Sequence, residues 1–130
     1  MSNYIYIMNQ ENITEIVRFF FTLQLNMKIY HWNTKSFARH KASDEFGGKL
    51  LPLVDKFVEV FIGKYKAKPM PSSIKILEGF VTDEGSESLL EKARDYLEKL
   101  NSKINDSELL NIRDELLGEV NQTLYLYQLK

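Results

Sequence analysis

The chain has no cysteine, which excludes disulfides, zinc–thiolate sites and cysteine nucleophiles and suits a reducing compartment. It also has no excess of charge of either sign. Its formal net charge is −1, so nothing favours nucleic acid or an anionic membrane as a partner. No apolar run approaches the roughly 18–20 residues that a membrane span needs, and the N-terminus lacks the basic segment and long apolar core of a signal peptide. These absences predict a cytoplasmic protein.

The remaining composition is ordinary for a globular protein. The chain has 130 residues, of which 44% are hydrophobic and 27% charged, and this fits one domain spanning residues 1–130. Apolar residues recur at helical spacing in four segments, and no segment alternates as a strand does. We expect helices over residues 12–33, 36–65, 86–101 and 106–129. The predicted fold is all-α, most simply an up-down four-helix bundle with a longer connection between the second and third helices.

The connection, residues 66–85, contains Pro69 and Pro71 and is expected to hold one short turn near residues 74–77. Two further features should bend the second helix. Gly47 and Gly48 weaken it, and Pro52 clashes with the carbonyl group four residues earlier. We therefore expect one helix with a kink near residues 47–52 rather than two helices.

The first helix is apolar on two faces. Asn12 is its expected N-cap, with Glu15 completing a capping box. A second apolar stripe, formed by Phe21, Leu25, Ile29 and Trp32, lies about half a turn away from the main one. Such a helix is either central in a core or shared with a partner, so the pattern suggests oligomerisation. The main stripe, expected to face the core, consists of Ile13, Ile16, Val17, Phe20, Leu23, Met27, Tyr30 and His31.

Four groups that can bind metal share one face of the second helix. His40, Asp44, Asp55 and Glu59 are separated by steps of four and eleven residues, which return to the same side of an α-helix. The ordinary interpretation of such a run is a solvated face. Apolar residues interleaved with the acids favour burial instead, and buried carboxylates need partners, of which metal ions are among the strongest.

The order of these groups is palindromic. His40 and Glu59 lie about 28 Å apart along the helix, so one chain cannot bring all four groups around one ion. The pairs His40/Glu59 and Asp44/Asp55 share a midpoint between Lys49 and Leu50. Two copies crossing antiparallel at this midpoint would form two equivalent sites, each built from both subunits. His31 adds a fifth ligand if it packs beside His40.

Imidazole and carboxylate ligands without thiolate suit iron or manganese, and zinc also fits the set. We therefore predict His31, His40, Asp44, Asp55 and Glu59 as metal ligands and catalytic residues. Tyr30 and Trp32 flank His31; core packing explains them best, although their position would also let them quench radicals from iron chemistry.

These motifs resemble those of the Dps family, the mini-ferritins that oxidise ferrous iron with peroxide. The resemblance rests on Tyr30-His31-Trp32, then on His40-x3-Asp44, and finally on Asp55-x3-Glu59. It implies a ferritin-like bundle, iron as the bound metal, and sites divided across a two-fold axis in a homo-oligomer, with a twelve-subunit cage as the family's usual assembly. The chain is also similar to trimmed ferritin-like proteins of viruses and phages, which would place it in a host cytoplasm or a virion. Residues 1–11 contain no lysine or arginine, so the family's DNA binding is not expected here.

Two interpretations follow, and a third is weaker. The first is ferrous oxidation and iron sequestration, with removal of peroxide, at sites between subunits. The alternative is a catalytically inactive ferritin-like protein that uses its two-faced first helix for assembly. Nucleic-acid compaction is the weakest, because no basic patch is evident: Lys64, Lys66 and Lys68 cluster locally, but lysines in a surface loop are usually just solvated.

Overall fold

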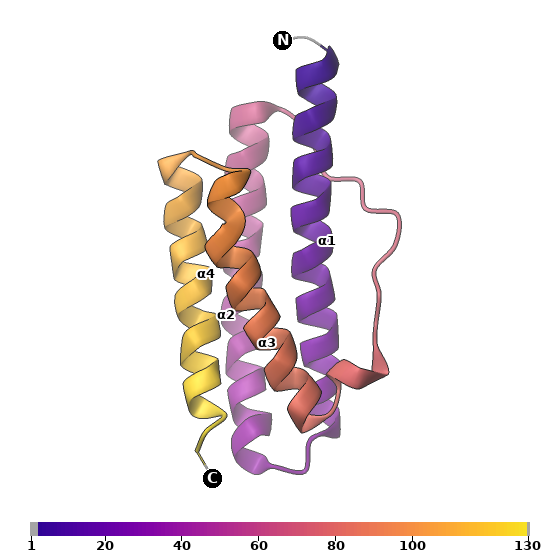
Figure 1. Ribbon diagram of the computed structural model, residues 1–130, viewed down its shortest axis with the longest axis vertical. Coiled ribbons are helices and arrows are strands. Elements are labelled where there is room, and N and C mark those ends of the chain that lie inside the picture. The colour runs from indigo at the N-terminus through magenta and orange to yellow at the C-terminus, as the bar shows by residue number, and fades with distance from the viewer. Residues whose placement is uncertain (1–2, 130) are drawn as a thin grey trace.

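The computed structural model describes residues 3–129, and every regular element among them is helical (Figure 1). This confirms the predicted all-α fold with four long helices. Two short 3-10 turns, η1 (Glu78–Phe80) and η2 (Lys99–Ser102), lie beside the ends of the third helix. None of the helices in this part of the chain is long and apolar enough to cross a bilayer. The four long helices are α1 (Asn3–Asn33), α2 (Phe37–Tyr65), α3 (Asp83–Glu98) and α4 (Ser107–Leu126).

Helix α1 begins nine residues before the predicted start. The predicted N-cap, Asn12, lies inside the helix, because nothing between Asn3 and Glu11 breaks the backbone hydrogen-bond pattern. Within this added segment, Asn9 is buried. The predicted main stripe is correct, since all eight of its residues are buried.

Helix α2 runs without interruption through Gly47, Gly48 and Pro52, as one helix rather than two. Ser36 caps its start, where the hydroxyl oxygen accepts a hydrogen bond from the backbone N–H of Arg39 at 3.2 Å. Lys66 ends it in the left-handed conformation with φ 60°.

The connection between α2 and α3 runs along α1 from Thr14 towards the end of that helix, as Figure 1 shows. The Met70 N–H donates to Thr14, Arg18 donates to the carbonyl of Ser73, and Asn26 bonds to the backbone further along. The connection therefore runs in the direction of α1 and delivers α3 to the far end of the bundle. As a result α2 and α3 run parallel, and the simple up-down arrangement predicted from the sequence is wrong.

Asn26 explains how this long connection is held. Its side chain is fully buried and bonds the backbone of the connection twice, donating to Lys75 O at 3.0 Å and accepting from Leu77 N at 2.9 Å. Because the nitrogen and the oxygen of this buried amide are both hydrogen-bonded, they hold the connection in place although it has no regular secondary structure there. The short turn predicted at residues 74–77 lies instead at 78–80.

Helix α4 runs antiparallel to α2. Near its start, the Tyr65 hydroxyl donates to Asp106 at 2.6 Å, and near its end Arg39 donates to the carbonyl of Tyr127 at 3.3 Å. The predicted third and fourth helices are each correct to within about three residues at either end. One contiguous core fills the space between the four helices, and its largest members are Tyr30, Phe20, Phe46, Phe57, Phe61, Ile13, Ile16, Leu23, Met27, Leu50, Leu90 and Leu97.

Candidate metal centre

The two histidines of the chain lie against each other where α1 turns into α2. Their rings stack, with centroids 3.9 Å apart and planes at 18°. Each ring bonds the backbone of the other residue: His31 Nδ1 lies 2.8 Å from the His40 carbonyl oxygen, and His40 Nδ1 lies 2.9 Å from the His31 carbonyl oxygen. Because a carbonyl oxygen only accepts hydrogen bonds, each Nδ1 carries a hydrogen. In the neutral ring, Nε2 then keeps its lone pair.

Ser43 supports this arrangement and was missed from the sequence. Its hydroxyl oxygen lies 3.3 Å from His31 Nδ1 and donates to the Arg39 carbonyl at 2.8 Å. Ser43 is buried and stands three residues after His40, on the same side of α2. That i, i+3 spacing is the signal that could have identified it.

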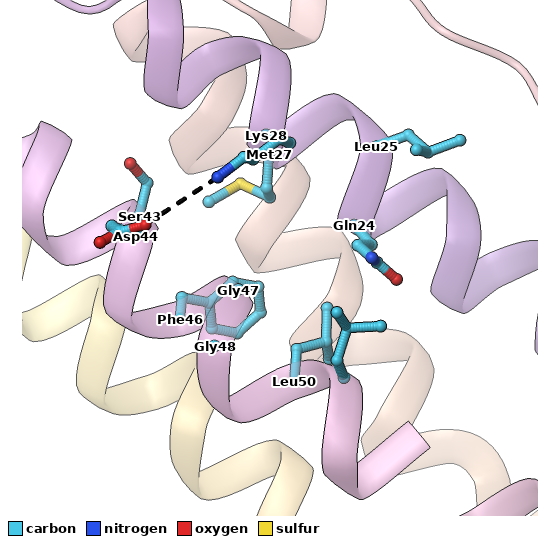
Figure 2. Close-up of a pocket in the computed structure, with 11 residues that line it drawn as sticks. Gln24, Leu25, Met27, Lys28, Ser43, Asp44, Phe46, Gly47, Gly48 and Leu50 are labelled. Atoms are coloured by element: carbon cyan, nitrogen blue, oxygen red, sulfur yellow. Dashed lines mark ion pairs between the residues drawn. The ribbon is translucent and has the colours of Figure 1, made fainter. Parts of the chain in front are cut away.

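Asp44 lies one turn beyond His40 on α2. One carboxylate oxygen is 3.9 Å from His31 Nε2 and 3.9 Å from Lys28 Nζ, and 62% of the side chain is exposed. Figure 2 shows Asp44 facing Lys28 across the gap between α1 and α2. This gap is a cavity of about 410 Å³ with Gly47 and Gly48 in its wall. Lys28 is a second residue that sequence reasoning missed.

Asp55 and Glu59 form a separate carboxylate pair further along α2. A hydrogen bond with Asp55, followed by the repulsion of its charge, raises the pKa of Glu59. The two carboxyl groups are therefore close enough to affect each other's protonation. Asp55 also lines a second cavity of about 410 Å³, bounded by Phe21 and Leu51 and by Pro69 of the connection.

The predicted ligands thus fall into two groups within one chain. His31, His40 and Asp44 lie at one end of α2, and Asp55 and Glu59 lie towards the other. Among residues 3–129 no three His, Asp or Glu groups converge closely enough to hold a metal ion. The spacing along α2 separates the two groups by roughly 16–28 Å, so the side chains of one chain do not bring them around one ion.

The second apolar stripe of α1 is uncovered in the single chain. Phe21 is 38% exposed, Leu25 39% and Trp32 68%, while Ile29 is partly buried. On the adjoining face of α2, Leu51 is 48% exposed. These side chains lie between and beside the two cavities, so α1 and α2 present one continuous face of apolar groups and acids, here called the α1–α2 face.

A polar network behind the histidines fixes the turn between α1 and α2. The buried Tyr30 hydroxyl donates to Asp83 at 2.7 Å, Thr34 donates to the same oxygen at 3.0 Å, and Arg39 donates to the Asp83 carbonyl at 3.0 Å. The hydrogen bond from Tyr30 is the largest influence on Asp83 and lowers its pKa. The network joins the turn to the start of α3 and so holds the two histidines in register.

The comparisons with known proteins identify a family but no characterised relative. Residues 31–127 match the family described as "Family of unknown function (DUF5856)". This range begins at His31 and includes all five predicted ligands. No curated protein and no solved structure matches the chain.

Proposed function

We propose that this chain, which belongs to the family of unknown function DUF5856, binds ferrous iron as a substrate between two subunits and oxidises it. The observation that carries the proposal is the reciprocal bonding of His31 and His40. Histidines that ligate metal usually donate the other ring N–H to a carbonyl or carboxylate group, which fixes the tautomer and the ring orientation. Both rings have this arrangement.

The donor set fits ferrous iron. Two imidazole nitrogens and up to three carboxylates, without thiolate, suit iron or manganese, with zinc able to compete. The acids also need a cation. Asp55 and Glu59 repel each other within one chain, and bringing Asp44 of a partner close to them would add a third negative charge. A divalent ion offsets this repulsion.

The register of α1 against α2 supports a two-fold dimer with shared sites. The stacked histidines show that His31 lies level with His40, and counting from them places Phe21 level with Leu50. A two-fold axis through the midpoint of the ligands therefore passes near Phe21 and Leu51, in the middle of the α1–α2 face. It places His31 and His40 of one chain level with Glu59 of the other, and Asp44 level with Asp55.

The surface at that axis is shaped for close approach. Leu51 projects from α2 with 48% of its surface exposed, and the two-fold axis places it level with Gly48 of the partner. A Cβ atom added at Gly47 or Gly48 would meet nothing within 4 Å. An exposed leucine thus faces a gap left by two glycines, which favours interdigitation of the two copies of α2.

The bundle topology supports the ferritin-like interpretation. Ferritin-like folds are four-helix bundles with one long crossover connection, and the connection along α1 has this form. In the proposed reaction two ferrous ions each give one electron to hydrogen peroxide. The O–O bond breaks, two protons are taken up, and two water molecules and two ferric ions result. With dioxygen as the oxidant, the first two electrons yield peroxide.

Anaerobic ferrous titration followed by peroxide tests the proposal. Wild type should bind ferrous iron stoichiometrically and oxidise it, and Asp55→Ala/Glu59→Ala should do neither. Glu91→Ala/Asp95→Ala, which removes an exposed acidic pair with the same spacing on α3, is the matched control. If wild type binds no iron, or the Asp55/Glu59 variant matches it, the site is wrong and the assembly interpretation takes its place. Mass in solution distinguishes a dimer from a cage.

A further inference from the structure

The N-terminal part of α1 is a helical extension that the bundle leaves largely uncovered. Residues 3–10 contain no charged side chain. Tyr4 is 74% exposed, Ile7 51% and Met8 42%. The register of the two helices places Tyr6 level with Tyr65 at the end of α2, so the first residues extend beyond α2, as Figure 1 shows. Ile7 lies on the same side of α1 as Phe21, Leu25 and Trp32, because these positions fall within about 40° of one another on a helical wheel.

A second uncovered apolar surface lies at the opposite end of the α1–α2 face. Trp32 is 68% exposed and Phe37 is 76% exposed. Both residues adjoin the histidine pair, Trp32 in sequence and Phe37 one turn before His40. Aromatic side chains carry roughly 150–250 Å² each. Tyr4, Trp32 and Phe37 together therefore leave on the order of 400 Å² exposed in each chain.

These two surfaces cannot meet within one chain. Ile7 and Trp32 are separated by about 37 Å along α1. The two-fold axis proposed above, however, places Ile7 of one chain level with residues 35 and 36 of the partner, in the turn between Trp32 and Phe37. The two proposed metal sites lie about 14 Å on either side of the axis, and each needs ligands from both chains. The two copies of α2 must therefore stay nearly antiparallel. The ends of the dimer therefore cannot splay far apart.

We infer that in the dimer the extension, residues 3–10 of one chain, packs over Trp32 and Phe37 of the partner and covers the outer side of its histidine pair. The inference rests on the proposed dimer and adds a contact outside the ligand set. The aromatic surface covered at both ends would be about 800 Å², half of the roughly 1,600 Å² that a standard stable interface buries. A second copy of this chain is therefore the partner that the extension fits.

The contact gives the extension a role at the metal site. His31 is only 8% exposed, whereas His40 is partly exposed and Asp44 is exposed. An apolar cover over the neighbouring Trp32 and Phe37 lowers the access of water to the histidine pair and strengthens the electrostatic interactions beneath it.

The single tryptophan of the chain reports the contact directly. In the wild-type dimer, acrylamide should quench Trp32 emission with a constant several-fold lower than in Tyr4→Ser/Ile7→Ser, and the emission should lie at shorter wavelength. Tyr125→Ser, which changes an aromatic residue on α4 that is 57% exposed, should leave Trp32 shielded. Sedimentation of every variant at the same concentration measures the dimer independently.

The absence of cysteine allows a second measurement. Ile7→Cys/Phe37→Cys should form a covalent dimer with a short thiol cross-linker, whereas each single variant should remain a single chain, because its two copies lie at opposite ends of the dimer. Two results with a dimeric protein would overturn this inference and leave the proposed function standing. Trp32 could be quenched equally with and without the Tyr4/Ile7 changes, or the double cysteine variant could fail to cross-link. Absence of any dimer overturns both.

Discussion

Two defective variants should restore each other if the metal site is divided between subunits. One variant, His40→Asn/Asp44→Ala, removes ligands from the histidine half of the site and keeps a side-chain donor near the His31 carbonyl. The other, Asp55→Ala/Glu59→Ala, removes the carboxylate half. The altered side chains are all at least partly exposed, so the bundle core is untouched and both variants should fold.

The expected recovery follows from the two-fold symmetry. Each variant alone forms dimers in which both sites lack one half. A mixed dimer pairs the intact histidine half of one chain with the intact carboxylate half of the other at one site, and its second site has neither half. With equal amounts of the two variants and random exchange, half of the dimers are mixed, so about a quarter of the wild-type sites return.

The assay is ferrous oxidation by peroxide after the two variants have been mixed, unfolded in denaturant and refolded together. About a quarter of the wild-type initial rate is expected, with each variant refolded alone as the blank. If the ligands acted within one chain, mixing could restore nothing, because each chain would still lack part of its own site. The division of the site between subunits is refuted if mass measurement shows mixed dimers but the mixture is no more active than the two variants measured separately.

Three further outcomes follow. Gly48→Leu should gain about 1 kcal/mol in helix stability yet sediment as a monomer, because the new side chain fills the gap opposite Leu51 of the partner. The control, Gly118→Leu at an exposed position on α4, should gain similar stability and remain a dimer. A dimeric Gly48→Leu would contradict the proposed packing. Asp83→Ala should cost about 1–3 kcal/mol in urea unfolding at pH 7, since it removes the carboxylate to which the buried Tyr30 hydroxyl donates. Because the pKa of Asp83 is lowered in the folded state, the difference in unfolding free energy between wild type and variant should shrink as pH falls through the acid range. A constant difference would argue against a hydrogen bond from Tyr30 to the ionised carboxylate. Asp55→Asn should raise the free energy of unfolding of the metal-free protein at pH 7, because it removes the charge that repels Glu59 and raises its pKa. This stabilisation should disappear at lower pH, where Glu59 is protonated. An unchanged stabilisation in acid would contradict the repulsion.

The sequence predicts the helices well where apolar residues repeat at regular spacing. The stripe from Ile13 to Tyr30 is buried as expected, because packing of that stripe dominates the local choice of structure. The prediction failed at the start of α1, where Asn12 resembled a cap. A capping residue favours a helix start only where the preceding residues cannot continue the helix, and residues 3–11 can.

The direction of α3 was beyond sequence reasoning for a different reason. The length of the connection allowed α3 to start at either end of the bundle. The choice depends on Asn26, whose two hydrogen bonds hold the connection along α1. An asparagine within an apolar helical stripe is compatible with several explanations, and only its partners across the fold show which one applies.

At the candidate site, the sequence predicted which residues share a face but not their bonding. The packing of His31 beside His40 was expected, and the stacked rings confirm it; their roles as metal ligands remain predictions. The reciprocal bonds to backbone carbonyl groups depend on a turn of only three residues between α1 and α2, whose exact path no periodicity specifies. Ser43 and Lys28 were missed because a single serine or lysine on a helix has many ordinary explanations.

The exposure of the acids is the strongest connection between the structure and the proposed dimer. Carboxylates interleaved with apolar groups suggested burial, yet Asp44, Asp55 and Glu59 are all exposed in the single chain. Beside them, Phe21 and Leu51 are also exposed. A solvated face would explain the acids but not the apolar side chains, and an ordinary hydrophobic interface would explain the apolar side chains but not the acids. A two-fold interface that encloses a cation accounts for both, because the apolar groups gain from burial and the ion compensates the charge that burial would otherwise leave unpaired.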